Sequence, residues 1–154
     1  MNNIRIAQYF RLATTDGTIH RYQNYFVGQA STFNSQSYNF APFQADGAMA
    51  SLNGENDQLR VLFPHIEYAL RLVEAGNGNR LSELELTTAW LNAAGTIVNA
   101  NTDYYIGIGA SFSETTIELR YRSAIDSVGS TFPARTLSRS LVGPLPLNSE
   151  LFLQ

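Results

Sequence analysis

The 154-residue sequence contains no cysteine, and all ten of its basic residues are arginine rather than lysine. The missing cysteines exclude disulfides, zinc–thiolate sites, iron–sulfur clusters and cysteine nucleophiles. No run of the chain approaches the ~18 consecutive apolar residues of a spanning helix, so no membrane span is expected. The first ten residues, MNNIRIAQYF, lack the basic and then apolar regions of a signal peptide, so none is expected there.

Charge is also scarce, since charged residues make up 15% of the chain, against about 25% in an average soluble domain. The net charge is −3 and the arginines are dispersed, so we expect no nucleic-acid specificity. Neutral polar residues take the place of charge, which is typical of a surface that neighbouring subunits cover. Arginine without lysine either suits ion pairs at such interfaces or follows from genome composition.

Apolar residues are plentiful and include eight tyrosines and nine phenylalanines. Disordered chains lack aromatic residues and carry more charge, so a folded chain is expected. The length predicts one domain with a core of its own.

Short alternating segments separated by turns predict strands along most of the chain. Residues 4–14 and 18–27 flank Asp16-Gly17, a dipeptide that favours a type I′ hairpin turn. A bulge or a bend is expected near Gln23-Asn24, where the alternation slips. Further strands are expected at residues 36–43, 48–52, 58–63, 81–91, 96–100, 104–112, 114–126 and 135–142.

One segment, near residues 64–75, has the periodicity of a helix. Pro64 suits the first helical position, and Gly76 suits a left-handed residue at the end. An apolar stripe is expected at Ile66, Ala69, Leu70 and Val73, and an ion pair is expected between Glu67 and Arg71.

These elements predict a mainly β fold: an antiparallel β-sandwich or barrel with one inserted α-helix and an extended C-terminal arm. The β domain is expected at residues 1–126 and the arm at residues 127–154. A βαβ fold would need several crossover helices. In the predicted core, Ile66, Leu70 and Val73 pack the helix on a sheet whose inner face includes Leu84, Leu86, Trp90, Ile117 and Leu119.

No arrangement of residues predicts catalysis, a metal site or a cofactor site. The two histidines, His20 and His65, have no second ligand at metal-binding spacing. The sequence has no Gly-x-Ser-x-Gly elbow, and Glu83 and Glu85 are interpreted as a solvated strand face. We therefore expect no enzyme, and a small hydrolase is the least favoured alternative.

Aromatic residues crowd one third of the chain. This cluster is interpreted as a core at one end of the fold or as an interface, with a sugar-stacking platform as the less favoured alternative. Its members are Tyr22, Tyr25, Phe26, Phe33, Tyr38, Phe40 and Phe43.

The C-terminal segment is predicted to be an arm that pairs as a strand with a neighbouring subunit, because an apolar end is poorly placed in water. The alternative is a closing strand of the same subunit. Pro144 and Pro146 favour an extended course and an edge position. The candidate interface residues are Arg135, Arg139, Leu145, Leu147, Leu151 and Phe152.

The order of motifs resembles the small tail-tip and baseplate-hub proteins of long-tailed bacteriophages. The motifs are TDGTIHRY at residues 15–22, YNFAPF at 38–43, AMASLNGEN at 48–56, LFP at 62–64 and LELTTAWL at 84–91. The larger hub proteins carry an iron–sulfur domain that a cysteine-free chain cannot hold.

The resemblance implies a structural virion protein that joins the end of the tail tube to the baseplate hub as a homo-oligomeric ring or hub layer. It implies contacts with other tail or baseplate proteins, a trimer rather than a hexamer, and assembly in the host cytoplasm before incorporation in the virion. The alternative function is a carbohydrate-binding β-sandwich module, for which a monomer with an exposed aromatic strip is expected.

Overall fold

The computed structural model describes residues 5–47 and 58–124. Within these ranges the chain forms nine strands and one helix, which confirms the mainly β class with an inserted helix. In chain order they are β1 Arg5–Ala13, β2 Ile19–Gln23, β3 Ser31–Phe33, β4 Gln36–Phe40, β5 Gln44–Asp46, β6 Gln58–Pro64, α1 Glu67–Ala75, β7 Arg80–Leu91, β8 Ile97–Phe112 and β9 Thr116–Ser123.

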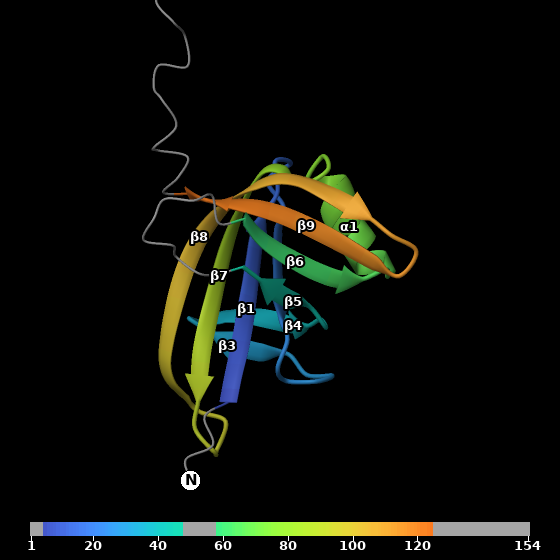
Figure 1. Cartoon of the computed structure of the whole chain (residues 1–154). Helices are drawn as coiled ribbons and strands as arrows, with labels where there is room; N and C mark the ends of the chain where they lie inside the picture. The colour runs from blue at the N-terminus through green and yellow to red at the C-terminus, as the bar shows by residue number, and fades with distance from the viewer. Residues whose placement is uncertain (1–4, 48–57, 125–154) are drawn as a thin grey trace, which may run out of the picture.

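The nine strands form one sheet in the order β3-β4-β2-β1-β7-β8-β9-β6-β5. Its pairs are antiparallel except for β2 with β4, which is parallel. In a flat sheet, β4 and β5 would lie about 34 Å apart, because seven strand spacings separate them. Residues 41–43 join these two strands and reach at most about 14 Å. The sheet therefore curls without closing, and Figure 1 shows β6 and β9 crossing β1 and β7 at a steep angle.

The main core fills the inside of the curled sheet. Because side chains alternate across a strand, each strand of the wall contributes about every second residue. The helix α1 covers this core with Ala69, Leu72 and Val73. The other buried members are Phe10, Leu12, Ala41, Phe43, Leu59, Val61, Phe63, Leu84, Leu86, Tyr105, Ile117, Leu119 and Tyr121.

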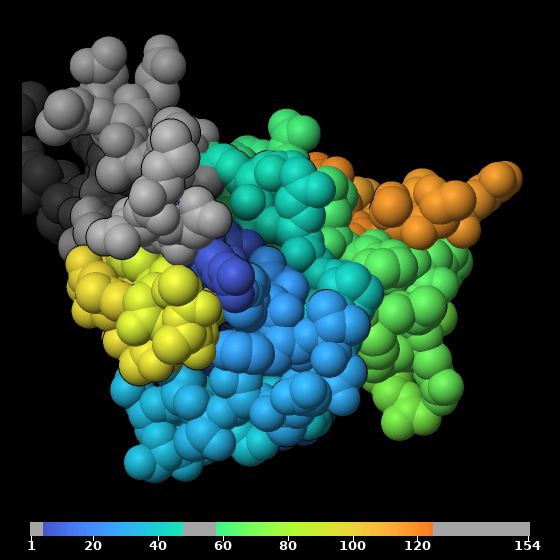
Figure 2. Space-filling model, turned by 90° about the horizontal axis from the view of Figure 1, so that it is seen from below, coloured from blue at the N-terminus to red at the C-terminus, as the bar shows by residue number. Residues whose placement is uncertain are grey.

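A second, smaller core lies on the opposite face of β1 and β7. In β1 the buried side changes between Tyr9 and Phe10, which are both buried although they point to opposite faces. The β3–β4 hairpin covers the second core, where the Phe33 ring stacks on Tyr9 at 4.8 Å and Tyr38 meets Tyr9 edge-on at 5.1 Å. Figure 2 shows β2 to β4, blue to cyan, forming the underside of the molecule. Burial on both faces gives the single sheet its sandwich-like character.

The expected bend at Gln23-Asn24 is present, and a buried amide organises it. Gln23 ends β2, and its Nε2 donates to the carbonyl oxygens of Phe26 and Gln29. Its Oε1 accepts from the backbone N–H groups of Tyr25 and Phe26. One fully buried side chain thus satisfies four backbone groups of the loop that leads to β3.

The turn geometry that is expected for the β1–β2 hairpin occurs in the β3–β4 hairpin instead. The β1–β2 hairpin forms as predicted, but Asp16 is not left-handed; Gly17 alone has a positive φ, of 86°. A type I turn followed by one left-handed glycine accounts for this three-residue pattern. The positive φ pair expected there occurs instead at Asn34 and Ser35, which join β3 to β4. No strand is expected from the sequence at residues 31–33, so this hairpin is not predicted.

The helix begins later than predicted, and its buried face is shifted: Ala69 and Val73 of the predicted stripe are buried, but Ile66 is not. Pro64 pairs with Thr116 as the last residue of β6, so α1 begins at Glu67. Leu72, absent from the predicted stripe, is fully buried, whereas Ile66 is 38% exposed. The ion pair between Glu67 and Arg71 is present.

At the end of α1, Gly76 has a φ of −87°, so it is not the left-handed residue that was expected. The left-handed positions that directly follow it are Asn77, Gly78 and Asn79. The left-handed reversal therefore comes after Gly76.

Trp90 is not part of the main core. Leu84 and Leu86 lie in that core as predicted, but after Leu86 the buried side of β7 changes to Ala89 and Leu91. Trp90 continues the Leu84–Leu86 face beyond the end of the core and is half-buried. Of the other predicted core residues, Val73, Ile117 and Leu119 are confirmed, and Leu70 is partly buried against the core.

The predicted strands at 96–100 and 104–112 are a single strand, β8. The strand β5, at Gln44–Asp46, follows residues 41–43 in the chain and pairs with β6. It is not among the predicted strands. The predicted strands at 48–52 and 135–142, the end of the one at 114–126 and the arm at 127–154 lie outside the described residues. The division of the chain at residue 126 therefore stays a prediction.

Candidate interaction surface

The two histidines lie on different parts of the fold. His20 lies on β2, where burial lowers its pKa, while His65 lies exposed before α1 with Nδ1 3.2 Å from the carbonyl oxygen of Glu114. In residues 5–47 and 58–124, no three histidine or acidic side chains come together as metal ligands. The carboxylate of Glu85 forms an ion pair with Arg11 at 2.7 Å.

The aromatic cluster packs inward. None of its seven side chains is exposed, and Tyr38 and Phe43 are buried outright. Phe43 stacks among the core rings of Phe10 and Phe63, on the opposite face of the sheet from Tyr38. Residues 22–43 therefore offer no flat exposed strip on which a sugar ring could stack.

The predicted interface residues of the arm all lie outside the described residues, so the structure does not place them. They are Arg135, Arg139, Leu145, Leu147, Leu151 and Phe152. The described sheet has two edges to which a strand could add, β3 and β5, each three residues long.

The described surface has an apolar feature on the outer side of β8. Tyr104 is 59% exposed and Ile108 is 38% exposed, with half-buried Ile106 between them. We call Tyr104, Ile106 and Ile108 the β8 stripe. These side chains point outward because the alternate positions, Tyr105 and Gly107, are buried. Leu81, 75% exposed, lies in the bulge of β7 between the partners of Ile108 and Ile106.

Opposite charges border the β8 stripe. On one side, β7 places Glu85 opposite Tyr104 and Glu83 opposite Ile106. On the other side, β9 places Arg122 opposite Ile106. Residues directly opposite in neighbouring strands share a face, so these charges project beside the stripe. The stripe thus has a basic border along β9 and, along β7, an acidic border that is interrupted by Arg80 opposite Ile108.

The basic border continues onto β6. Arg60 is directly opposite Arg120, an arrangement that is unfavourable for like charges. The Nε atoms of Arg120 and Arg122 are shielded from water without a hydrogen-bond partner, and Glu118 is 3.9 Å from Arg120. A shallow hollow of about 330 Å³ adjoins this border and is lined by Asp46, Gly47, Gln58, Arg60, Leu62 and Glu118.

A buried asparagine holds the β8 stripe in place from behind. Asn79 has a left-handed φ of 61°, and its Nδ2 donates to the carbonyl oxygens of Gly109, at 3.3 Å, and Arg120, at 3.2 Å. These bonds span the irregular pairing between β8 and β9 at Gly107 and Gly109. Gly107 lies so close to Asn79 that no side chain fits there. Glycine inside a strand marks a bulge or a close approach of another backbone, and both occur at Gly107.

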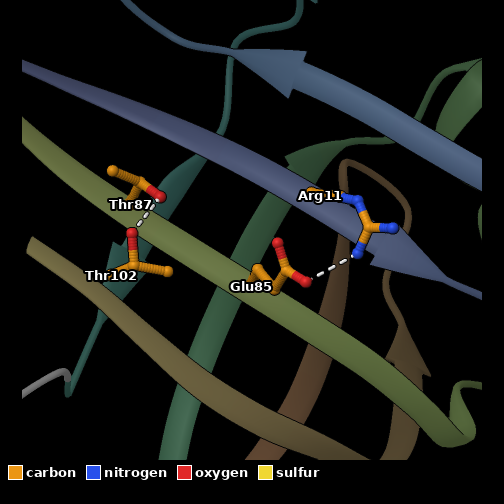
Figure 3. A network of polar contacts seen from close by, with 4 residues as sticks. All are labelled: Arg11, Glu85, Thr87 and Thr102. Carbon is orange, nitrogen blue, oxygen red and sulfur yellow. Dashed lines mark hydrogen bonds and ion pairs between the residues drawn. The ribbon is translucent and has the colours of Figure 1, made fainter. Parts of the chain in front are cut away.

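Two polar contacts anchor the acidic side of this face. Figure 3 shows Arg11 of β1 donating to Glu85 of β7, and the hydroxyls of Thr87 and Thr102 meeting at 2.8 Å between β7 and β8. The Arg11–Glu85 pair is partly exposed, with 27% and 36% of the two side chains accessible. Both contacts link neighbouring strands and fix the register beside the stripe.

The sequence analysis did not identify the β8 stripe. The sequence feature that corresponds to the stripe is the alternation of apolar residues at 104, 106 and 108. This alternation indicates that the three side chains share one face of a strand, but not whether that face is covered. The sequence predicts a strand at residues 104–112 and no contact surface on it.

The described part of the chain has a single helix, and its nine residues are too few to cross a bilayer. The sequence matches no protein-family model and no curated protein. The fold is similar to that of a chain in a solved structure described as "Virion of native gene transfer agent (GTA) particle", with a TM-score of 0.62 and 12% sequence identity. The match covers 82% of this chain and 42% of that chain, so this protein spans less than half of the chain that it resembles. At this identity, the likeness shows a shared fold.

Proposed function

We propose that the protein is a structural, non-enzymatic component of a phage-like virion. The observation that carries the proposal is the fold shared with a chain of a gene transfer agent virion over 82% of the present chain. The low content of charge and the exposed apolar stripe on β8 support a chain that works in contact with other subunits.

In its finer form, the proposal places the protein in the tail or baseplate. There it joins the end of the tail tube to the baseplate hub as a homo-oligomeric ring or hub layer, with a trimer favoured over a hexamer for the ring itself. Other tail or baseplate proteins are its further partners, and assembly takes place in the host cytoplasm. The motifs between residues 15 and 91 support this placement by their order.

A composition measurement on intact particles tests the proposed location. Particles released by the producing cells are purified on a density gradient and analysed by quantitative mass spectrometry. We expect the chain to co-purify with the particles in a fixed number of copies above one, because a ring contains several subunits. Particles of full infectivity or transfer activity that lack the chain would contradict the proposal.

The arm contributes a second prediction. Truncation after Val142 removes Leu145, Leu147, Leu151 and Phe152 from the proposed contact with a neighbouring subunit. We expect the shortened chain to keep its circular dichroism spectrum and its cooperative melting. Its molar mass by light scattering should fall, because fewer subunits associate. A charge change in the retained segment, Arg139→Glu, should weaken the same association because arginine pairs with carboxylates across interfaces. Outright unfolding of the truncated monomer would identify the segment as a closing strand of its own subunit.

A further inference from the structure

The outer face of β8 carries a row in which an apolar side chain lies between opposite charges. Ile106 is directly paired with Glu83 on β7 and with Arg122 on β9. Among the ion pairs of the described residues, neither Glu83 nor Arg122 takes part. The Nε of Arg122 is also shielded from water without an acceptor. This row therefore presents an acid, an apolar group and a base, with both charges available to a partner.

The apolar part of this surface is larger than one residue. Tyr104 and Ile108 extend it along β8, and Leu81 adds an exposed apolar side chain at the neighbouring bulge. Leu81 has a φ of 59°, a conformation that is unusual for a bulky residue and that occurs where other contacts compensate its cost. An exposed apolar patch with charged borders is typical of a surface that contacts another protein.

We propose that the β8 stripe is the contact surface for a second copy of this chain, in a two-fold pair whose axis runs parallel to β8. Rotation about such an axis places β7 of one copy over β9 of the other. Glu83 of each copy then faces the partner's Arg122, while the two Ile106 side chains meet between these pairs. A two-fold axis across the strands would instead place each acid on the same acid, which Coulomb repulsion disfavours.

The charges of the row favour a second copy over other partners. A nucleic acid or an anionic membrane surface would require a uniformly basic face, whereas Glu83 and Glu85 lie on one border here. The acid–apolar–base row is complementary to itself after the rotation, as an isologous contact requires. Arg80, opposite Ile108, is the exception to the acidic charge of the β7 border; on β9, Glu118 lies 3.9 Å from Arg120 of the same chain.

Two single charge reversals test this arrangement. Glu83→Arg gives a chain with two basic borders, and Arg122→Glu gives a chain with two acidic borders. Each variant alone should have half the light-scattering mass of the unaltered chain under the same conditions. Mixed at equal concentrations, the two variants should restore the full mass, because each border of one then faces the opposite charge of the other. Tyr104→Ser should raise the dissociation constant of the pair by about tenfold, the effect of removing a central aromatic contact.

Glu74→Arg is the matched control, since it makes the same charge change at an exposed position of α1, away from the stripe. It should leave the mass unchanged, and circular dichroism should show that all four variants are folded. If neither charge reversal changes the mass, the stripe is not a contact between copies. If the single variants dissociate but their mixture does not reassociate, the proposed axis is wrong. The arm contact is tested separately by the truncation, so the failure of one proposal is distinguishable from the failure of the other.

Discussion

Replacement of Gly107 by alanine should strongly destabilise the protein, far more than the same replacement at Gly109, the other glycine of β8. An added Cβ at this position would lie 2.0 Å from the backbone oxygen of Asn79 and 3.0 Å from its Oδ1. The obstructing atom belongs to the backbone of a buried residue that bonds Gly109 and Arg120, so it cannot turn aside. We expect the free energy of unfolding to fall by at least about 3 kcal/mol, at the upper end for an overpacked core.

Gly109→Ala is a precise control for that change. Gly109 lies two residues along the same strand, its φ is not positive, and an added Cβ would meet nothing within 4 Å. Its effect on stability should stay within about 0.5 kcal/mol, as for an ordinary surface exchange. Chemical denaturation of the two variants, followed by circular dichroism, measures the difference. Equal losses of stability would show that Asn79 does not lie against Gly107.

Leu72→Ala is expected to have the second large effect. Leu72 is fully buried where α1 meets the main core. Truncation of a buried leucine removes transfer free energy and leaves a cavity, which together cost about 2–5 kcal/mol. The melting temperature and the midpoint of urea denaturation should both fall clearly, with the slope of the urea transition unchanged.

The neighbouring positions of the helix give the comparison. Leu70 is only partly buried against the core, and Ile66 is 38% exposed, so each alanine variant should lose less stability than Leu72→Ala. The helical periodicity of the sequence ranks these residues in the opposite order, since it places Ile66 and Leu70 on the packed stripe. If Leu72→Ala were milder than Leu70→Ala, the helix would be docked by the face that the sequence predicts.

The helix shows that local periodicity does not decide which face is buried, and the candidate surface likewise depends on tertiary structure. Each charge of the β8 stripe's borders is visible in the sequence, but Glu83, Ile106 and Arg122 are brought into one row only by strand pairing. A contact between residues so far apart in the chain depends on register, and register follows from the packing of the whole sheet. No periodicity within a single segment could predict which charges would border the stripe.

Local chemistry sufficed for the mainly β class, for the β1–β2 hairpin and for the inward positions of Leu84, Leu86, Ile117 and Leu119. These features follow from alternation and turn residues, which act over a few neighbouring positions. Two features did not follow from local chemistry: which face of α1 is buried, and why Trp90 lies outside the main core. Both depend on which side of the element is covered by another part of the chain. The β3–β4 hairpin folds over one face of β1 and β7 while α1 covers the other, so the buried side changes within a strand. Burial on both faces is a property of the assembled sheet, and for that reason only the tertiary structure decided it.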